Sequence, residues 1–129
     1  MCLYINRRWC NNFTVCEQLC LPDIELLSVS LRPFYLLREF PRVYVTIVYI
    51  HPKANAEIAA NIIFRVIQSL QSTSPDAPNL ILGDFNHCNL KKTLSSFYQY
   101  VNCPTRYDQT LDLCYGSIKG AYKSCPRIL

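Results

Sequence analysis

The most informative part of the sequence is the stretch Asn79–His87, which reads NLILGDFNH. Its apolar run is too short for a helix and predicts a strand that is buried on both faces. Gly83 then lets the backbone turn or approach another group closely. In α/β proteins, ligands and reactive groups gather beyond the carboxyl ends of strands, which is where Asp84, Asn86 and His87 follow. We therefore expect a functional site here. The alternative is an Asx turn, in which Asp84 and Asn86 only satisfy nearby backbone amides.

Two preceding segments predict a βαβ unit that leads into this strand. Residues 42–50 are rich in β-branched and aromatic side chains and stop before Pro52, which is typical of a central strand. From Asn55 to Leu70, apolar residues recur every three to four positions, which predicts an amphipathic helix capped by Asn55. We expect strands 42–50 and 79–82 to be parallel, or at least in one sheet, with their carboxyl ends on the same edge.

Shorter patterns predict the remaining elements. Cys2–Ile5 and Phe13–Cys16 are expected to form an opening hairpin, because the residues between them favour a turn. Alternating apolar and polar residues predict a strand over Ile24–Leu31. Leu90–Val101 is expected to be a second amphipathic helix, and Leu111–Tyr115 a last strand.

Composition limits the class of protein. With 129 residues, of which 50% are hydrophobic, the chain has the length of one domain and can bury a core. Its net charge of +4 is mild and scattered, which is compatible with a polyanionic partner but is also common on ordinary surfaces. No apolar run approaches the roughly 20 residues needed to span a bilayer, so we expect a soluble protein with no membrane partner.

The eight cysteines are expected to remain thiols. The sequence begins without the pattern of a secretory signal, which favours a reducing, intracellular compartment. No Cys-x-x-Cys pair is present, and no histidine stands at zinc-finger spacing from a cysteine pair, so structural zinc is not expected.

Further polar residues stand at the ends of the other predicted strands. Tyr49 and His51 end the strand over residues 42–50, and Asp112 interrupts an otherwise apolar strand. A buried carboxylate is costly unless it is paired or hydrogen-bonded, so Asp112 requires a partner. Two interpretations are open: a structural pair with Arg106 or Lys119, or an orienting group for a catalytic histidine.

The run Leu82–Asn86 resembles the Gly-Asp-Phe-Asn signature of the endonuclease/exonuclease/phosphatase superfamily, which includes the DNase-I-like nucleases. Val48–Pro52 and Thr110–Leu113 stand where that family has supporting segments, so the resemblance covers nearly the whole chain. The sequences of Val48–Asn55, Asn79–Cys88 and Thr110–Ser124 are most similar to the endonuclease domain of LINE-type (non-LTR) retrotransposons, which nicks target DNA. The resemblance implies an α/β fold, part of a two-sheet sandwich of mixed β-sheets flanked by helices, with residues 1–129 forming one incomplete domain.

The resemblance also implies a role for each site residue. Asp84 positions or deprotonates the attacking water. Asn86 orients that water and stabilises the pentacovalent phosphate, and Tyr49 lies against the scissile phosphate or the leaving oxygen. Asp112 holds the imidazole of a phosphate-binding histidine. The implied partner is DNA and the implied cofactor is Mg²⁺, with Asp84 and Asn86 as its ligands. Oriented nucleophiles and charge-stabilising groups are what phosphodiester hydrolysis needs.

Substrate contacts are expected from His51, His87 and Thr110. His87 follows the signature directly, where it contacts DNA or only caps a turn, and the turn is the favoured alternative. Neither histidine occupies the position of the family's terminal histidine.

The sequence also departs from the family pattern. A metal-binding glutamate upstream and a Ser-Asp-His motif downstream are both missing, and Glu25 lies in the wrong context to replace the former. We therefore expect an endonuclease-like chain that is inactive by itself and nuclear if it functions, with no obligate protein partner indicated. Alternatives are a nucleic-acid-binding remnant, a phosphoesterase of the same fold, or the inactive product of a decayed element.

Overall fold

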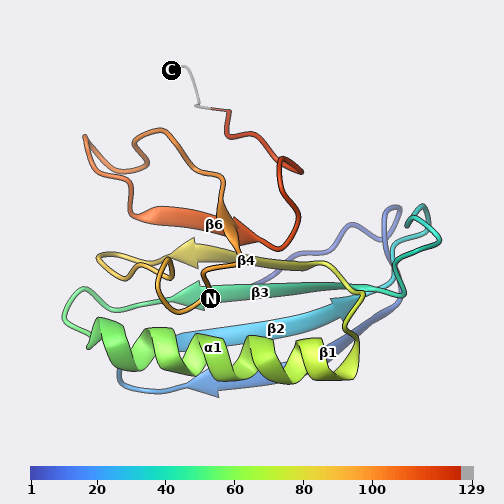
Figure 1. The fold of residues 1–129 in the computed structure, drawn as a ribbon, viewed down its shortest axis with the longest axis horizontal. Coiled ribbons are helices and arrows are strands. Elements are labelled where there is room, and N and C mark those ends of the chain that lie inside the picture. Colours follow the sequence, from blue (N-terminus) through green and yellow to red (C-terminus); the bar gives the residue numbers. More distant parts are fainter. Residues whose placement is uncertain (126–129) are drawn as a thin grey trace.

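Six strands form one mixed sheet in this computed structural model, which describes residues 1–125. One helix lies along one face of that sheet, as Figure 1 shows. The elements in chain order are β1 (Phe13–Cys20), β2 (Glu25–Leu31), β3 (Val43–Tyr49), α1 (Ala56–Thr73), β4 (Asn79–Asp84), β5 (Tyr98–Gln99) and β6 (Asp112–Gly116). The strand order is β1-β2-β3-β4-β6-β5, and the predicted α/β class is confirmed.

The centre of the sheet is the predicted βαβ unit. Strands β3 and β4 pair in parallel, from Tyr44 opposite Asn79 to Tyr49 opposite Asp84, while every other pair of named strands is antiparallel. Helix α1 makes the crossover between β3 and β4, so the carboxyl ends of both strands point to the same edge. The expectation of parallel strands is therefore confirmed.

Apolar clusters lie on both faces of the sheet. The larger one fills the space between the sheet and α1, which contributes Ala59, Ala60, Ile63, Val66, Ile67 and Leu70. The smaller one, on the opposite face, joins Cys10 to Val29, Val45 and Ile47 beneath the N-terminal segment. No helix in residues 1–125 is long and apolar enough to cross a membrane.

Helix α1 begins at a side-chain cap. The Asn55 Oδ1 atom accepts hydrogen bonds from the backbone N–H groups of Glu57, at 3.0 Å, and Ile58, at 3.2 Å. Asn55→Ala removes this cap, and we expect it to lower the free energy of unfolding by about 1 kcal/mol, measured by urea denaturation. Asn61→Ala is the control, because Asn61 is exposed within the same helix and alanine favours helix, so this change should cost nothing. Equal losses in both variants would contradict the capping role.

The helix predicted over Leu90–Val101 is wrong. That segment forms successive turns, and Tyr98–Gln99 then pairs with β6. Leu90, Leu94 and Phe97 are buried, as the pattern predicts, but consecutive turns bury residues at this spacing as well as a helix does. A short helix is marginal by itself, and pairing with β6 satisfies the backbone instead.

The predicted opening hairpin is also wrong, because its two segments do not pair with each other. Cys2–Ile5 is not a strand, and the chain turns at residues 7–9. The strand that begins at Phe13 extends to Cys20 and pairs with β2 through a tight turn, in which Leu21 and Ile24 exchange backbone hydrogen bonds. The pairing of β1 with β2 leaves the N-terminal apolar residues to pack on the sheet face, where Leu3 and Ile5 join the smaller cluster.

Candidate functional site

Three of the predicted site residues lie in one row across the sheet. Tyr49 is the register partner of Asp84, and Asp84 is the register partner of Asp112. Glu25 pairs with Tyr49 and extends the row by one strand. Side chains at paired positions of neighbouring strands point to the same face, so this row presents three carboxylates and a phenol on the face opposite α1.

Asp84 uses both of its carboxylate oxygens. Oδ1 accepts a hydrogen bond from the backbone N–H of Asn86 at 3.1 Å, and Oδ2 forms an ion pair with the Arg106 guanidinium at 3.0 Å. The Asp84 side chain is only 17% exposed, whereas that of Arg106 is 49% exposed. The carboxylate is therefore fixed in orientation, with a cation on its open side.

Asn86 is locked beside Asp84 by its amide. Its Nδ2 atom donates to the backbone carbonyl of Ile50, just beyond β3, and the side chain is buried. The N–H of Ile50 in turn donates to the carbonyl of Asp84 at 2.9 Å. The backbone of Asn86 has a φ of 49°, a left-handed conformation that asparagine tolerates better than most residues. Asn86 thus fastens the turn after β4 to the end of β3.

Asp112 lies opposite Asp84 on the neighbouring strand and is half-buried. Like charges directly opposite each other across two strands are destabilising, and the Arg106 guanidinium reduces that repulsion. The interpretation in which Arg106 pairs with Asp112 is wrong, because Arg106 pairs with Asp84 instead. Lys119 makes no ion pair among the described residues.

The three predicted substrate contacts lie in two places, with His51 beside Tyr49 of the row, and His87 and Thr110 in a hollow that none of the row's residues lines. His51 is exposed, its Nδ1 atom accepts a hydrogen bond from the Lys53 N–H at 3.1 Å, and its ring stands edge-on to that of Tyr49 at 6.5 Å. His87 and Thr110 are exposed and line a hollow of about 740 Å³ that also reaches Asn86.

The Thr110 hydroxyl is already used within its loop. It donates to the carbonyl of Cys103 at 3.1 Å, so it closes the loop before β6. A substrate contact from Thr110 stays a prediction, as do those from His51 and His87.

Buried thiols and a buried phenol near the site are unsuited to act as nucleophiles at neutral pH. Burial raises the pKa of the Cys88 and Cys114 thiols. Burial also raises the pKa of the Tyr115 phenol, although the Leu90 N–H, which donates to its oxygen at 3.2 Å, acts in the opposite direction. Thiolate and phenolate are the reactive forms, so these groups serve packing instead.

The acidic row does not by itself fit a Mg²⁺ ion. Within residues 1–125, no group of three or more His, Cys, Asp or Glu side chains is placed to hold a metal. The Oδ2 atom of Asp84 also faces a guanidinium, which repels a divalent cation. Metal ligation by Asp84 and Asn86 therefore stays a prediction that needs further ligands.

Sequence reasoning did not place two residues in this site, since it gave Glu25 no role and considered Arg106 only as a partner of Asp112. Glu25 enters it only through the antiparallel pairing of β2 with β3, and it lines a groove of about 540 Å³ together with Tyr49 and Asp84. Arg106 enters it from the hairpin that precedes β6, through its ion pair with Asp84. Both depend on contacts between distant parts of the chain, and no local pattern signals them.

Comparisons with known proteins find solved structures of similar fold but no relative by sequence. Neither a protein-family model nor a curated protein matches this chain. Among solved structures, an endonuclease/exonuclease/phosphatase family protein from Bacteroides thetaiotaomicron matches 81% of this chain with 51% of its own, at a TM-score of 0.53 and 10% identity.

Two structures of TDP2 from D. rerio match similarly. One, humanized by 14 mutations, covers 90% of this chain with 52% of its own, at a TM-score of 0.54 and 10% identity. The other, complexed with single-strand DNA product, covers 88% with 55% of its own, at a TM-score of 0.52 and 13% identity. At these identities the likeness concerns the fold alone. The chain spans about half the length of these structures.

Proposed function

We propose that this chain supplies part of a phosphodiester-hydrolysing site, of the type used by the DNA-nicking endonuclease of a LINE-type retrotransposon. The observation that carries the proposal is the pairing of Tyr49, Asp84 and Asp112 in one row across three strands, with Asn86 locked beside them. A carboxylate, an amide and a phenol at one edge suit a phosphodiester, because its hydrolysis needs an oriented water and donors where charge develops.

Each side chain has a distinct role in this proposal. Asp84 orients or deprotonates the attacking water, and Asn86 fixes the turn that holds Asp84 in place. Tyr49, which is 36% exposed, donates from its hydroxyl to a phosphate oxygen. Asp112 orients a histidine that the remainder of a larger domain provides. Mg²⁺ dependence, if the complete domain has it, needs ligands beyond those described, and a working protein of this type acts in the nucleus.

A second candidate is nucleic-acid binding without cleavage. The ion pair of Asp84 with Arg106 favours it, because both carboxylate oxygens of Asp84 already accept hydrogen bonds from the protein, Oδ2 from Arg106 and Oδ1 from the Asn86 N–H. The two candidates share one property, which is recognition of a nucleic-acid backbone at the row of Tyr49, Asp84 and Asp112.

That shared property can be tested by a substitution that removes a single hydroxyl group. We expect Tyr49→Phe to weaken binding of a fluorescein-labelled single-stranded DNA by about tenfold, because it removes one hydrogen bond to a charged phosphate and little else. Fluorescence anisotropy measures the dissociation constant. Tyr35→Phe is the control, since Tyr35 is 92% exposed in the loop between β2 and β3, at the other end of the sheet (Figure 1).

The proposal is supported if only Tyr49→Phe weakens binding while circular dichroism shows both variants folded. It fails if the unaltered chain does not bind DNA, or if the two tyrosine variants bind equally well.

A further inference from the structure

The Arg106 guanidinium is only partly used by its ion pair. One of its nitrogens contacts Asp84 Oδ2 at 3.0 Å, and half of the side chain remains exposed. Arginine carries five N–H donors in a planar fork, so donors remain for a second anion. A phosphate is the anion whose geometry suits this fork, and the guanidinium stands beside the carboxylate that the proposed function assigns to the reacting water.

The backbone holds Arg106 in place before any ligand arrives. Arg106 and Gln109 exchange two backbone hydrogen bonds of 3.0 Å, which close a tight hairpin. The Thr105 hydroxyl oxygen then accepts from the N–H groups of Leu111 and Asp112, at 3.0 and 3.1 Å. The hairpin is thus tied to the first residue of β6, next to Asp84 in the sheet register. Preorganised donors lose less entropy when they bind.

An aromatic ring stands at the tip of the same hairpin. Tyr107 is 97% exposed and has a φ of 55°, which is strained for an aromatic residue. Packing does not explain this position, because the ring is almost wholly in water. Exposed aromatic rings next to cations are the usual platform on which unpaired bases stack.

We infer that the hairpin of residues 105–110 is a nucleic-acid-binding element, in which Arg106 holds a backbone phosphate beside Asp84 and Tyr107 stacks on a neighbouring base. The inference rests on the proposed function for its ligand, and it adds the residues that hold the strand. The inference also gives the ion pair a role. Asp84 orients the guanidinium, and the guanidinium attracts the phosphate to a position beside Asp84.

Two variants separate the phosphate contact from the stacking contact. We expect Arg106→Gln to weaken single-stranded DNA binding about tenfold and to reduce the slope of log K against log salt by about 0.7, because one phosphate contact is lost. Tyr107→Asn should weaken binding at least about fivefold with no change in slope, because stacking releases no counterion. Asparagine is chosen because it accepts the left-handed backbone at this position.

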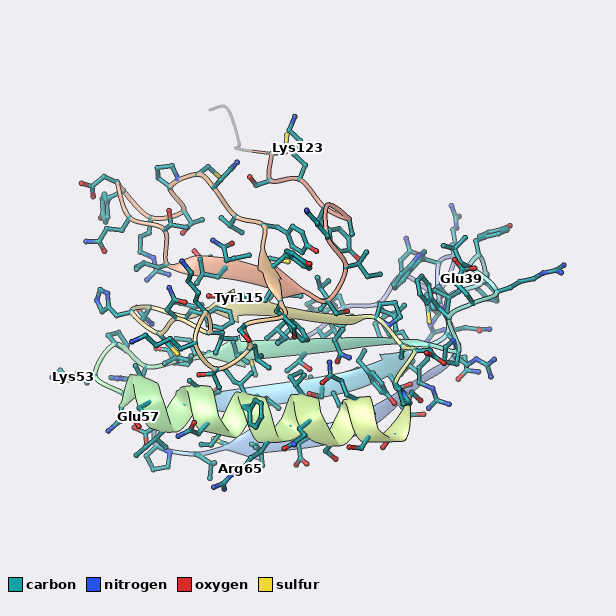
Figure 2. All side chains as sticks on the ribbon, in the orientation of Figure 1. Glu39, Lys53, Glu57, Arg65, Tyr115 and Lys123 are labelled. Atoms are coloured by element: carbon teal, nitrogen blue, oxygen red, sulfur yellow. The ribbon has the colours of Figure 1, made fainter. Side chains whose placement is uncertain are left out.

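Matched controls lie elsewhere on the molecule. Arg65→Gln makes the same charge change on α1, and Figure 2 shows Arg65 projecting away from β6. Tyr35→Asn removes an equally exposed tyrosine at the other end of the sheet. Both controls should leave the affinity and the salt slope at the values of the unaltered chain. Arg106→Lys, which keeps the charge, should keep the slope while binding more weakly.

The outcomes distinguish this inference from the proposed function. If the unaltered chain binds DNA but Arg106→Gln and Tyr107→Asn bind it as tightly as their controls, the hairpin is not a binding element. This conclusion would hold whatever the effect of Tyr49→Phe on binding. If Arg106→Gln is unfolded by circular dichroism, Tyr107→Asn and Arg106→Lys decide, because unchanged affinity in both overturns the inference. If the unaltered chain did not bind DNA at all, the proposed function itself would be refuted.

Discussion

Gly83→Ala is expected to remove a large part of the stability of this chain. Gly83 has a φ of 146°, and a Cβ atom built on it would lie 2.0 Å from the carbonyl oxygen of Val48 and 2.9 Å from the carbonyl carbon. Both are backbone atoms of the paired central strand β3, so no side chain can move aside. Backbone strain and the separation of β3 from β4 should together cost more than about 4 kcal/mol, out of a typical total of 5–15 kcal/mol.

The comparison that isolates the steric effect is Gly120→Ala. Gly120 also has a left-handed backbone, with a φ of 67°, but no atom lies within 4 Å of the added Cβ. Its replacement should cost only about 1–2 kcal/mol, from the conformational preference of alanine alone. Urea denaturation followed by circular dichroism measures both. Similar losses in the two variants would show that the close approach of Gly83 to Val48 does not control stability.

The second expected result concerns catalysis: the 129-residue chain alone should leave supercoiled plasmid uncut at a rate near background, even with Mg²⁺. Within residues 1–125, no histidine forms an ion pair with Asp112, and no group of three or more potential ligands is placed to hold a metal. Loss of a single stabilising donor costs an enzyme about 10²–10³-fold, and the losses of cooperating groups are severe though not additive.

Efficient nicking by the unextended chain, abolished by Asp84→Ala, would contradict this expectation. In that case a residue of this chain must replace the missing histidine. His51 is the first to test, because its ring lies 6.5 Å from that of Tyr49. His51→Ala and His87→Ala, assayed in parallel, would identify which histidine acts.

The sheet centre could be predicted from sequence because its signals are local. The β-branched run that ends at Tyr49 and the apolar run before Gly83 report burial directly, and the period of α1 reports its packed face. Once these elements are ordered as strand, helix and strand, the parallel pairing follows. The location of Tyr49 and Asp84 at one edge is a consequence of that pairing, and the structure has them as direct register partners.

The parts that could not be predicted depend on pairing between distant segments. Apolar residues recur at helical spacing over residues 90–101, yet Tyr98 and Gln99 form backbone hydrogen bonds with the free edge of β6 instead. Arg106 is 22 residues from Asp84, and only the hairpin that precedes β6 brings the two together. Spacing of apolar residues reports which side chains are buried, but it does not report which strand edge a loop will reach.

Nicking of supercoiled plasmid by a completed domain tests the proposed site most directly. The chain is extended at both ends by the segments that the superfamily resemblance places before and after it, and is compared with the same protein carrying Asp84→Ala. We expect the extended protein to nick DNA with Mg²⁺, and Asp84→Ala to slow nicking by at least about 10²-fold while the protein stays folded. An extended, folded protein that nicks equally well with and without Asp84 would contradict the assignment of this sheet edge as a phosphodiester-hydrolysing site.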